Sequence, residues 1–254
     1  MSFVTIGPGR IEYERIDGEH PSAPTFVMLH EGLGSVAMWR DFPAQLARAS
    51  RSTVVTYSRH GYGHSEPLHG SRDVRYMHHE AIIVLPLFLH ALGIERPILF
   101  GHSDGASIAL IYAGSTPGDV AGVVALAPHV MVEDISITSI AAAKVSYQTT
   151  DLRARLARYH DDVDGAFWGW NNIWLSPAFR SWNIEEYLPR IECPILAIQG
   201  EQDEYGTMEQ IERIARAAPR VETLRLENCR HSPHRDRPEA VLAAVARWTA
   251  ALRE

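Results

Sequence analysis

The sequence predicts an α/β fold built on a mostly parallel sheet with helices on both faces. Short apolar, β-branched runs alternate with longer stretches of helical spacing through most of the 254 residues. These runs are apolar along their whole length, as strands are when helices cover a parallel sheet on both faces. With 46% apolar and 22% charged residues, the chain is long enough to bury one sizeable core.

The first part of the chain alternates strands with one helix. Residues Gly9–Ile16 show strand-like alternation of side chains. Thr25–His30 (TFVMLH) and Ser52–Tyr57 (STVVTY) are continuous apolar or β-branched runs and are predicted to be buried strands. Between them, Met38–Ala49 is predicted to be a helix because its apolar residues fall at helical spacing, namely Trp39, Phe42, Leu46 and Ala49.

The middle of the chain repeats the pattern. Tyr76–Leu92 is predicted to be a long helix with a kink at Pro86, since proline removes a backbone donor inside a helix. Pro97–Gly101 (PILFG) is predicted to be a buried strand, Asp104–Ala113 a helix, and Gly122–Ala127 (GVVALA) another buried strand.

The last part of the chain resumes the alternation after an interruption. Pro194–Gly200 (PILAIQG) and Val221–Leu226 are predicted to be strands. Helices are expected near Met208–Ala218 and over Pro238–Leu252. The series completes a sheet whose strands alternate with helices on both faces.

Residues 130–188 break this rhythm because they contain no clear strand and their apolar content is aromatic. Four of the six tryptophans fall between positions 168 and 182. We interpret the stretch as a helical cap over the carboxyl edge of the sheet, with residues 1–129 and 189–254 forming the core domain. Trp168 and Trp174 are candidate pocket residues, and the alternative is that these rings form the small core of the insertion itself.

Composition excludes several classes of function. The formal net charge of −7 leaves no basic footprint for nucleic acid or an anionic membrane. No apolar stretch has transmembrane length, and the start (MSFVTIGPGR) lacks a signal-peptide pattern, so we expect a cytoplasmic protein. Two cysteines form no disulfide framework, and no metal-ligand spacing occurs, so no metal is expected. The sequence does not define the oligomeric state.

The sharpest local signal is Gly101-His102-Ser103-Asp104-Gly105. It follows the apolar run PILF and opens the helical stretch ASIALIYAG. Small residues flank the serine because a tight turn from strand to helix leaves no room for larger side chains. Such a turn exposes the Ser103 hydroxyl at the end of the sheet, beside the positive end of a helix, and Ser103 is therefore the candidate nucleophile.

A serine hydroxyl needs a base, and the base needs a carboxylate to orient it. Asp203 follows the strand PILAI, and His231 follows the strand region VETLRLEN, so both are expected at the carboxyl edge with Ser103. The order of serine, acid and histidine fits this architecture. Local alternatives stay open: the acid could be Glu201 or Glu204, and the base could be His234.

The reaction also needs donors for the oxyanion that develops on the substrate. The loop His30-Glu31-Gly32-Leu33-Gly34-Ser35 follows the strand TFVML and can turn backbone N–H groups inward. One donor is assigned to the Gly32 N–H, with Leu33 as the neighbouring possibility. The other is assigned to the N–H of Asp104, next to the nucleophile.

Further side chains are candidates for contact with substrate. His129 ends the sixth predicted strand and should point toward the same edge, and Tyr205 lies two residues after Asp203. The loop residues Glu31 and Leu33 complete this set, and the Asp104 carboxylate offers a partner for a substrate ammonium. Structural roles are the alternatives: a hydrogen-bonded buried histidine for His129, and a charge at a helix start for Asp104.

In LHEGLGS, YSRHGYGHS, GHSDG, ILAIQGEQD and CRHSPHRDRPE, all in family order, the sequence resembles the α/β-hydrolase superfamily over nearly its whole length. The resemblance implies an eight-stranded, mostly parallel sheet, a cap after the sixth strand, and a triad of Ser103, Asp203 and His231. The chain is similar to the small capped esterase and carbon–carbon hydrolase branch. Its Ser-Asp-Gly elbow also resembles that of the valacyclovir hydrolase-like branch. Two departures are Glu31 and Arg230, which both stand where glycine is usual.

These features predict a cofactor-independent serine hydrolase, with a carboxylic ester of a small or medium acid as the expected substrate. Hydrolysis of a carbon–carbon bond in ring-cleavage products, hydrolysis of an aminoacyl ester or amide, and cofactor-free haloperoxidase or perhydrolase activity are alternatives on the same triad. A non-catalytic ligand receptor is a further alternative, although such proteins usually lack triad members. A carboxylate nucleophile, as in epoxide hydrolases, is disfavoured because Ser103 occupies the elbow.

Overall fold

The structure, a computed structural model, describes residues 1–7, 9–20 and 22–252 around an eight-stranded sheet. The strand order is β1-β2-β4-β3-β5-β6-β7-β8. β1 pairs antiparallel with β2, β2 pairs antiparallel with β4, and the remaining neighbours are parallel. This confirms the predicted α/β class. The strands are β1 (Ser2–Ile6), β2 (Gly9–Ile16), β3 (Phe26–Leu29), β4 (Val54–Tyr57), β5 (Ile98–His102), β6 (Gly122–Leu126), β7 (Ile195–Gly200) and β8 (Val221–Leu226).

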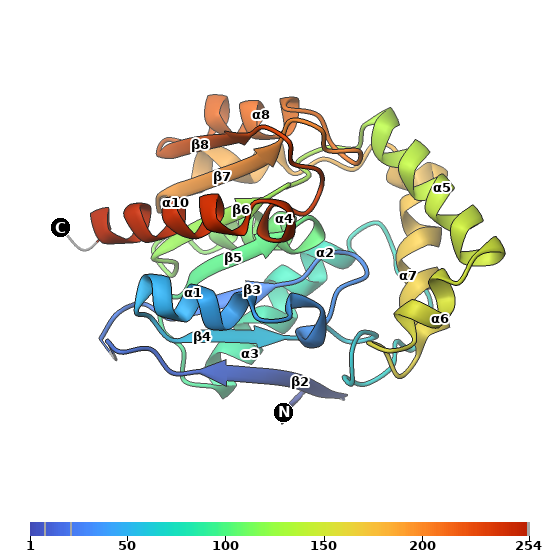
Figure 1. The fold of residues 1–254 in the computed structure, drawn as a ribbon, viewed down its shortest axis with the longest axis horizontal. Helices are drawn as coiled ribbons and strands as arrows, with labels where there is room; N and C mark the ends of the chain where they lie inside the picture. The colour runs from blue at the N-terminus through green and yellow to red at the C-terminus, as the bar shows by residue number, and fades with distance from the viewer. Residues whose placement is uncertain (8, 21, 253–254) are drawn as a thin grey trace.

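Helices cover both faces of the sheet because the central strands bury side chains on both sides. α1 (Phe42–Ser50) and α10 (Pro238–Ala251) pack together over one face, in front of the sheet in Figure 1. α3 (Leu85–Ala91), α4 (Asp104–Ser115) and α8 (Glu209–Ala217) cover the other face. Each face thus has its own buried apolar cluster, and the sheet forms a rigid base for the loops at its edge.

Two predicted helices are interrupted in the structure. The predicted helix Met38–Ala49 is divided into η1 (Val36–Trp39) and α1, because Arg40 between them has a positive φ of 55°. The predicted helix Tyr76–Leu92 consists of α2 (Tyr76–His79), the π-helical η2 (Glu80–Val84) and α3. The π turn lies directly before Pro86, where the missing N–H and the proline ring exclude a regular α-helical turn.

Helices α5 (Asp134–Thr149), α6 (Leu152–Leu156) and α7 (Val163–Trp174) lie beside the carboxyl ends of the parallel strands (Figure 1). Their own aromatic contacts include Tyr147 stacked on Phe167, with ring centroids 3.7 Å apart. Two short elements follow, η3 (Pro177–Phe179) and η4 (Glu185–Arg190), and η4 packs against α4 and α8. The division into a core domain and a cap at positions 129 and 189 stays a prediction.

The chain between β8 and α10 contains α9 (Pro233–Asp236), which the sequence pattern did not predict.

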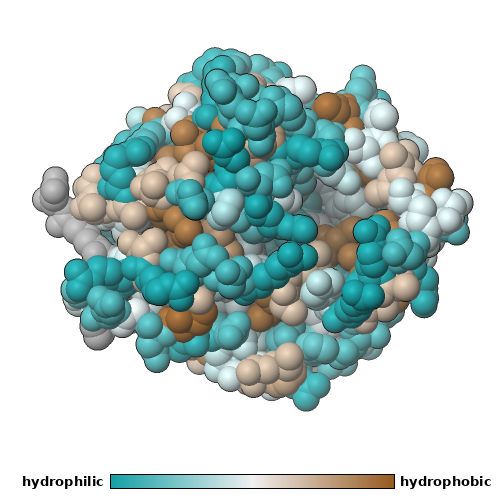
Figure 2. Space-filling view, in the orientation of Figure 1, coloured by the Kyte–Doolittle hydropathy of each residue, from teal (hydrophilic) through white to brown (hydrophobic). Residues whose placement is uncertain are grey.

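On the face drawn in Figure 2, hydrophilic side chains cover most of the surface and hydrophobic ones form small, separate patches. Among the described residues, no helix has the length and apolar content needed to cross a membrane.

Candidate active site

Ser103 occupies a sharp turn between β5 and α4. Its backbone has φ 54° and ψ −119°, a conformation that costs energy for a non-glycine residue and persists only when its surroundings enforce it. The flanking glycines show how: a Cβ on Gly101 would lie 2.3 Å from the Gly105 carbonyl oxygen, and a Cβ on Gly105 would lie 2.1 Å from the Leu29 carbonyl oxygen. Close packing of β5, α4 and β3 therefore requires both glycines and presents the Ser103 hydroxyl at the edge.

The structure brings the three predicted triad residues together. The Ser103 Oγ lies 2.9 Å from Nε2 of His231, and Nδ1 of His231 lies 2.9 Å from each carboxylate oxygen of Asp203. The Asp203 side chain is 1% exposed and that of His231 is 13% exposed. An imidazole held in this way accepts the serine proton at Nε2 while the carboxylate stabilises the positive charge that forms.

Asp203 is fixed by three donors besides His231. Its Oδ1 accepts from the backbone N–H groups of Tyr205 (2.8 Å) and Gly206 (3.3 Å), and its Oδ2 accepts from Nε2 of the buried Gln199 (2.7 Å). Burial disfavours the carboxylate, but the neighbouring His231 and these donors outweigh it and lower the pKa of Asp203 below its usual value. The site therefore holds Asp203 as an anion.

The charge of Asp203 also acts on the base. Burial alone would lower the pKa of His231, but the attraction of Asp203 outweighs burial and raises this pKa above its usual value. At neutral pH a raised pKa makes the imidazole a stronger proton acceptor, which suits a general base.

The residues that the sequence left open as alternative acid or base make other contacts. Glu204 accepts from the backbone N–H of His231 at 3.3 Å rather than from its ring, and it pairs with Arg230. The backbone of Glu201 is bonded to Leu226, and its side chain is exposed. The buried ring of His234 packs against Trp39, with centroids 4.8 Å apart.

The loop after β3 forms a tight turn. The Gly34 N–H donates to the Glu31 carbonyl oxygen at 3.1 Å, which leaves Gly32 and Leu33 as the central residues of the turn. Within the described residues, the N–H groups of Gly32, Leu33 and Asp104 donate to no acceptor. These free donors are what an oxyanion hole requires.

The Glu31 side chain is directed to His102, the residue before the nucleophile. Its Oε2 lies 3.3 Å from Nδ1 of the buried His102, whose Nε2 lies 2.7 Å from the carbonyl oxygen of His231. Burial would raise the pKa of Glu31, but the hydrogen bond with His102 outweighs it and lowers this pKa well below the usual value. The Glu31 carboxylate thus connects the turn to the segments that carry Ser103 and His231.

Of the predicted pocket residues, three contact the triad region. The His129 ring lies 5.7 Å from that of His231, and the ring of Trp174 lies 5.0 Å from that of His129. The Tyr205 ring lies 4.7 Å from that of His231. Burial, followed by the nearby His231, lowers the pKa of His129 to about 3, so this imidazole is neutral near the base. The Trp168 ring instead packs within the α5–α7 segment, on Tyr147 and Phe167.

The Asp104 carboxylate is buried beside these residues. Its Oδ2 accepts from the Tyr76 hydroxyl at 2.6 Å, and that hydroxyl accepts from Nε1 of Trp174 at 3.0 Å. Its Oδ1 is enclosed and has no partner among the described residues. Burial raises the pKa of Asp104 above its usual value, although the positive charge of Arg59 opposes this.

Sequence reasoning missed several residues of the site: Gln199, Tyr76, His102, His160 and Trp170. A signal existed for Gln199, since it is a polar residue at the end of an otherwise apolar strand, four residues before Asp203. His102 directly precedes Ser103, whereas Tyr76, His160 and Trp170 reach the site from segments distant in sequence, and their positions depend on packing. Trp170 in particular lies against Gly32: a Cβ on this glycine would lie 2.2 Å from the Trp170 Nε1.

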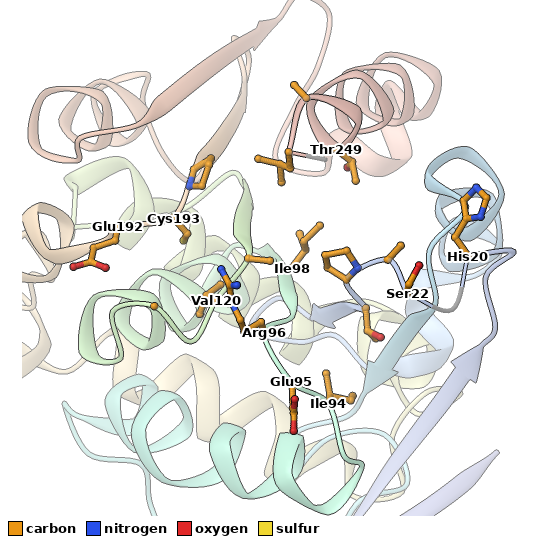
Figure 3. Close-up of a pocket in the computed structure, with 18 of the residues that line it drawn as sticks. His20, Ser22, Ile94, Glu95, Arg96, Ile98, Val120, Glu192, Cys193 and Thr249 are labelled. Carbon is orange, nitrogen blue, oxygen red and sulfur yellow. The ribbon is translucent and has the colours of Figure 1, made fainter. Parts of the chain in front are cut away.

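A separate hollow lies at the opposite edge of the sheet, at the amino ends of the strands. It has a volume of about 1260 Å³. Figure 3 shows Arg96, Glu192 and Cys193 on one side of it and His20 and Ser22 on the other. None of the predicted site residues lines it. The candidate active-site residues therefore lie at the carboxyl edge and not in this hollow.

Three features together define an α/β hydrolase. The sheet is parallel except for β2, Ser103 lies at a strained turn after β5, and Asp203 and His231 follow β7 and β8. The model of the alpha/beta hydrolase family matches residues 26–244, and the chain belongs to this family of hydrolases.

Individual relatives are distant. The chain is 25% identical over 181 residues to the bifunctional esterase/perhydrolase DCH of Acinetobacter calcoaceticus, a match that spans 59% of this chain and 64% of that relative. It is 28% identical over 215 residues to the human serine hydrolase BPHL, spanning 79% of this chain and 69% of that relative. Its fold is similar to that of the enol-lactonase from Burkholderia xenovorans LB400, with a TM-score of 0.77, 20% identity and coverage of 98% and 100% of the two chains.

Proposed function

We propose that the protein is a cofactor-independent serine hydrolase that cleaves carboxylic esters of small or medium acids. The Ser103 Oγ attacks the ester carbonyl carbon while its proton passes to Nε2 of His231. The N–H groups of Gly32 and Asp104 stabilise the oxyanion. Collapse of the intermediate breaks the bond to the alcohol oxygen, which takes the proton from His231. Water, activated by the same imidazole, then cleaves the acyl-enzyme and releases the acid.

One observation carries this proposal: the 2.9 Å distance between the Ser103 Oγ and the His231 Nε2, with Asp203 on the other side of the ring. A hydroxyl at a strained turn beside a helix start has no need of such a partner for stability, whereas a nucleophile requires it. Two relatives, an esterase/perhydrolase and a serine hydrolase, support the same reaction class.

A second candidate substrate is an aminoacyl ester, and a specific observation favours it. The Asp104 Oδ1 is enclosed and unpartnered next to the nucleophile, and an ammonium group on the acyl part would give it a partner. Comparison of an aminoacyl ester with the acyl ester of the same alcohol separates the two. A ring-cleavage product and peroxide-dependent oxidation in acetate buffer complete the panel.

A fluorophosphonate probe is expected to label the protein at one residue, Ser103, with loss of ester turnover in proportion to labelling. The reason is that the reagent requires a hydroxyl activated by a base. Mass spectrometry of the digested protein identifies the labelled residue. Labelling at another serine, or full labelling with activity retained, would remove the basis for Ser103 as nucleophile.

The pH dependence of kcat/KM follows from the raised pKa of His231. The neutral imidazole is the active form, so activity is lost as pH falls through this pKa. Because Asp203 raises it, the acid limb is expected above the ordinary histidine value of about 6.5. The measurement is ester hydrolysis in buffers from acid to weakly alkaline pH at constant ionic strength. A rate independent of pH down to about 5 would exclude His231 as the base.

A further inference from the structure

The turn that carries the Gly32 N–H is held on its core side by Arg59. The buried guanidinium of Arg59 donates from Nη2 to the Glu31 carbonyl oxygen at 2.8 Å, and Nδ1 of His30 lies 2.7 Å from the same oxygen. The Glu31 C=O and the Gly32 N–H belong to one planar peptide group, so these contacts set the orientation of the Gly32 N–H from its carbonyl side. They do not reach Leu33, whose carbonyl group sits on the far side of the turn.

The far side is held by a residue from the segment between α6 and α7. Nε2 of His160 lies 2.9 Å from the Leu33 carbonyl oxygen, and the Gly63 N–H donates to Nδ1 of the same ring at 2.9 Å. An N–H points at Nδ1 and a carbonyl oxygen faces Nε2, so the ring is neutral with its proton on Nε2. His160 is 4% exposed, and burial lowers the pKa of its imidazole, which maintains this state.

A second side chain from the same region closes on the turn. The indole ring of Trp170 in α7 lies directly on Gly32, so closely that a Cβ at this position would be 2.2 Å from Nε1 and 2.3 Å from Cδ1. Gly32 and Leu33, the two central residues of the turn, are thus each contacted by a residue from outside the sheet-and-helix core. The contacts of His160 are polar and directional, and those of Trp170 limit how far Gly32 can rotate.

We propose that His160 is a positioning residue for the oxyanion hole: by binding the Leu33 carbonyl oxygen and the Gly63 N–H together, it fixes the Leu33–Gly34 peptide group. It thereby holds the second half of the turn in place and keeps the Gly32 N–H at the position that stabilises the oxyanion. The inference rests on the proposed hydrolase function. It also makes a productive oxyanion hole depend on the seating of the α5–α7 segment against the core. A donor that is displaced by a fraction of an ångström loses much of its effect in the transition state but little in substrate binding.

The test compares two substitutions of similar length in the full chain. His160→Gln retains one acceptor for Gly63 and one donor for Leu33, whereas His160→Met has no donor and only a weakly accepting sulfur. His160→Met is expected to lower kcat for a p-nitrophenyl ester by about 10- to 100-fold, with a change in KM within about threefold. His160→Gln is expected to recover most of kcat. A trifluoromethyl ketone, whose adduct places an oxyanion in the hole, should lose affinity in His160→Met by the same factor as kcat/KM.

A matched control is His64→Ala. Nδ1 of the partly exposed His64 contacts Asp161 at 2.8 Å and so joins the same two segments without touching the oxyanion turn. Its kcat is expected to equal that of the wild type. Circular dichroism and thermal unfolding establish that each variant folds. Should His160→Met not fold, His160→Asn takes its place, because its shorter amide reaches only one of the two partners and the same loss of kcat is expected.

The positioning role would be overturned by a wild-type kcat in His160→Met, or by equal losses in His160→Met and His160→Gln. A loss confined to KM, with inhibitor affinity unchanged, would also overturn it. Failure of the proposed function would give a different result from failure of the positioning role, namely that Ser103→Ala retains ester turnover. If Ser103→Ala is inactive while His160→Met is fully active, only the positioning role is wrong.

Discussion

Replacement of Ser103 by alanine is expected to lower kcat for a p-nitrophenyl ester by about 10³-fold or more and to leave the protein folded. The substitution removes the hydroxyl 2.9 Å from Nε2 of His231 and with it the atom that forms the acyl-enzyme. Alanine has the same backbone preferences as serine at φ 54°, so the strain of the turn is unchanged. Steady-state kinetics and the unfolding temperature measure the two effects separately.

The matched control is Ser115→Ala, at the end of the same helix. The Ser115 hydroxyl has no partner among the residues that the structure describes, so its loss should change neither kcat nor KM. Retention of most of the activity by Ser103→Ala, together with a wild-type unfolding temperature, would show that another group attacks the ester. The residual rate of a true nucleophile variant reflects only binding and the oxyanion donors.

Local patterns in the sequence were sufficient for most of the fold. The strands that are apolar along their length, such as β5 and β7, are continuous in the sequence and buried in the structure. β1 did not stand out as a strand in the sequence pattern, because it is a short edge strand whose side chains are mostly exposed. The break at Arg40 escaped prediction, since spacing alone does not specify a positive φ. Pro86 predicted a kink in its helix but not that the distortion takes the form of a π turn.

The candidate site, like the fold, is only partly predictable from local sequence patterns. Ser103 is encoded in five consecutive residues, and Asp203 and His231 each follow a recognisable strand. His160 contacts Leu33 across 127 positions, and no local pattern predicts such a contact. Helical geometry, however, does separate the tryptophans of α7. Residues two positions apart on a helix are rotated by about 200° around its axis, so Trp168 and Trp170 face opposite sides. Trp170 and Trp174, four positions apart, share the side that faces the site.

Exchange of Asp203 for asparagine is expected to lower kcat by roughly 10³- to 10⁴-fold, nearly as much as loss of the nucleophile. Every known neighbour of this carboxylate is a donor: the N–H groups of Tyr205 and Gly206 at Oδ1, and Nε2 of Gln199 at Oδ2. An amide nitrogen in the Oδ2 position meets the Gln199 donor and offers a hydrogen to Nδ1 of His231. The imidazole then carries its proton on Nε2, which faces Ser103 and prevents proton transfer.

The same exchange removes the charge that raises the pKa of His231, so the acid limb of the residual activity should move to lower pH than in the wild type. Glu204→Gln is the matched control: this carboxylate contacts the backbone N–H of His231 and not the ring, so kcat should fall by less than about threefold. Asp203→Asn could instead keep more than about a tenth of wild-type kcat, with the acid limb of its pH profile unchanged. In that case the carboxylate would set neither the tautomer nor the charge of the His231 imidazole. The two readouts are independent, because a merely distorted site would lose rate without a directed shift of the pH profile.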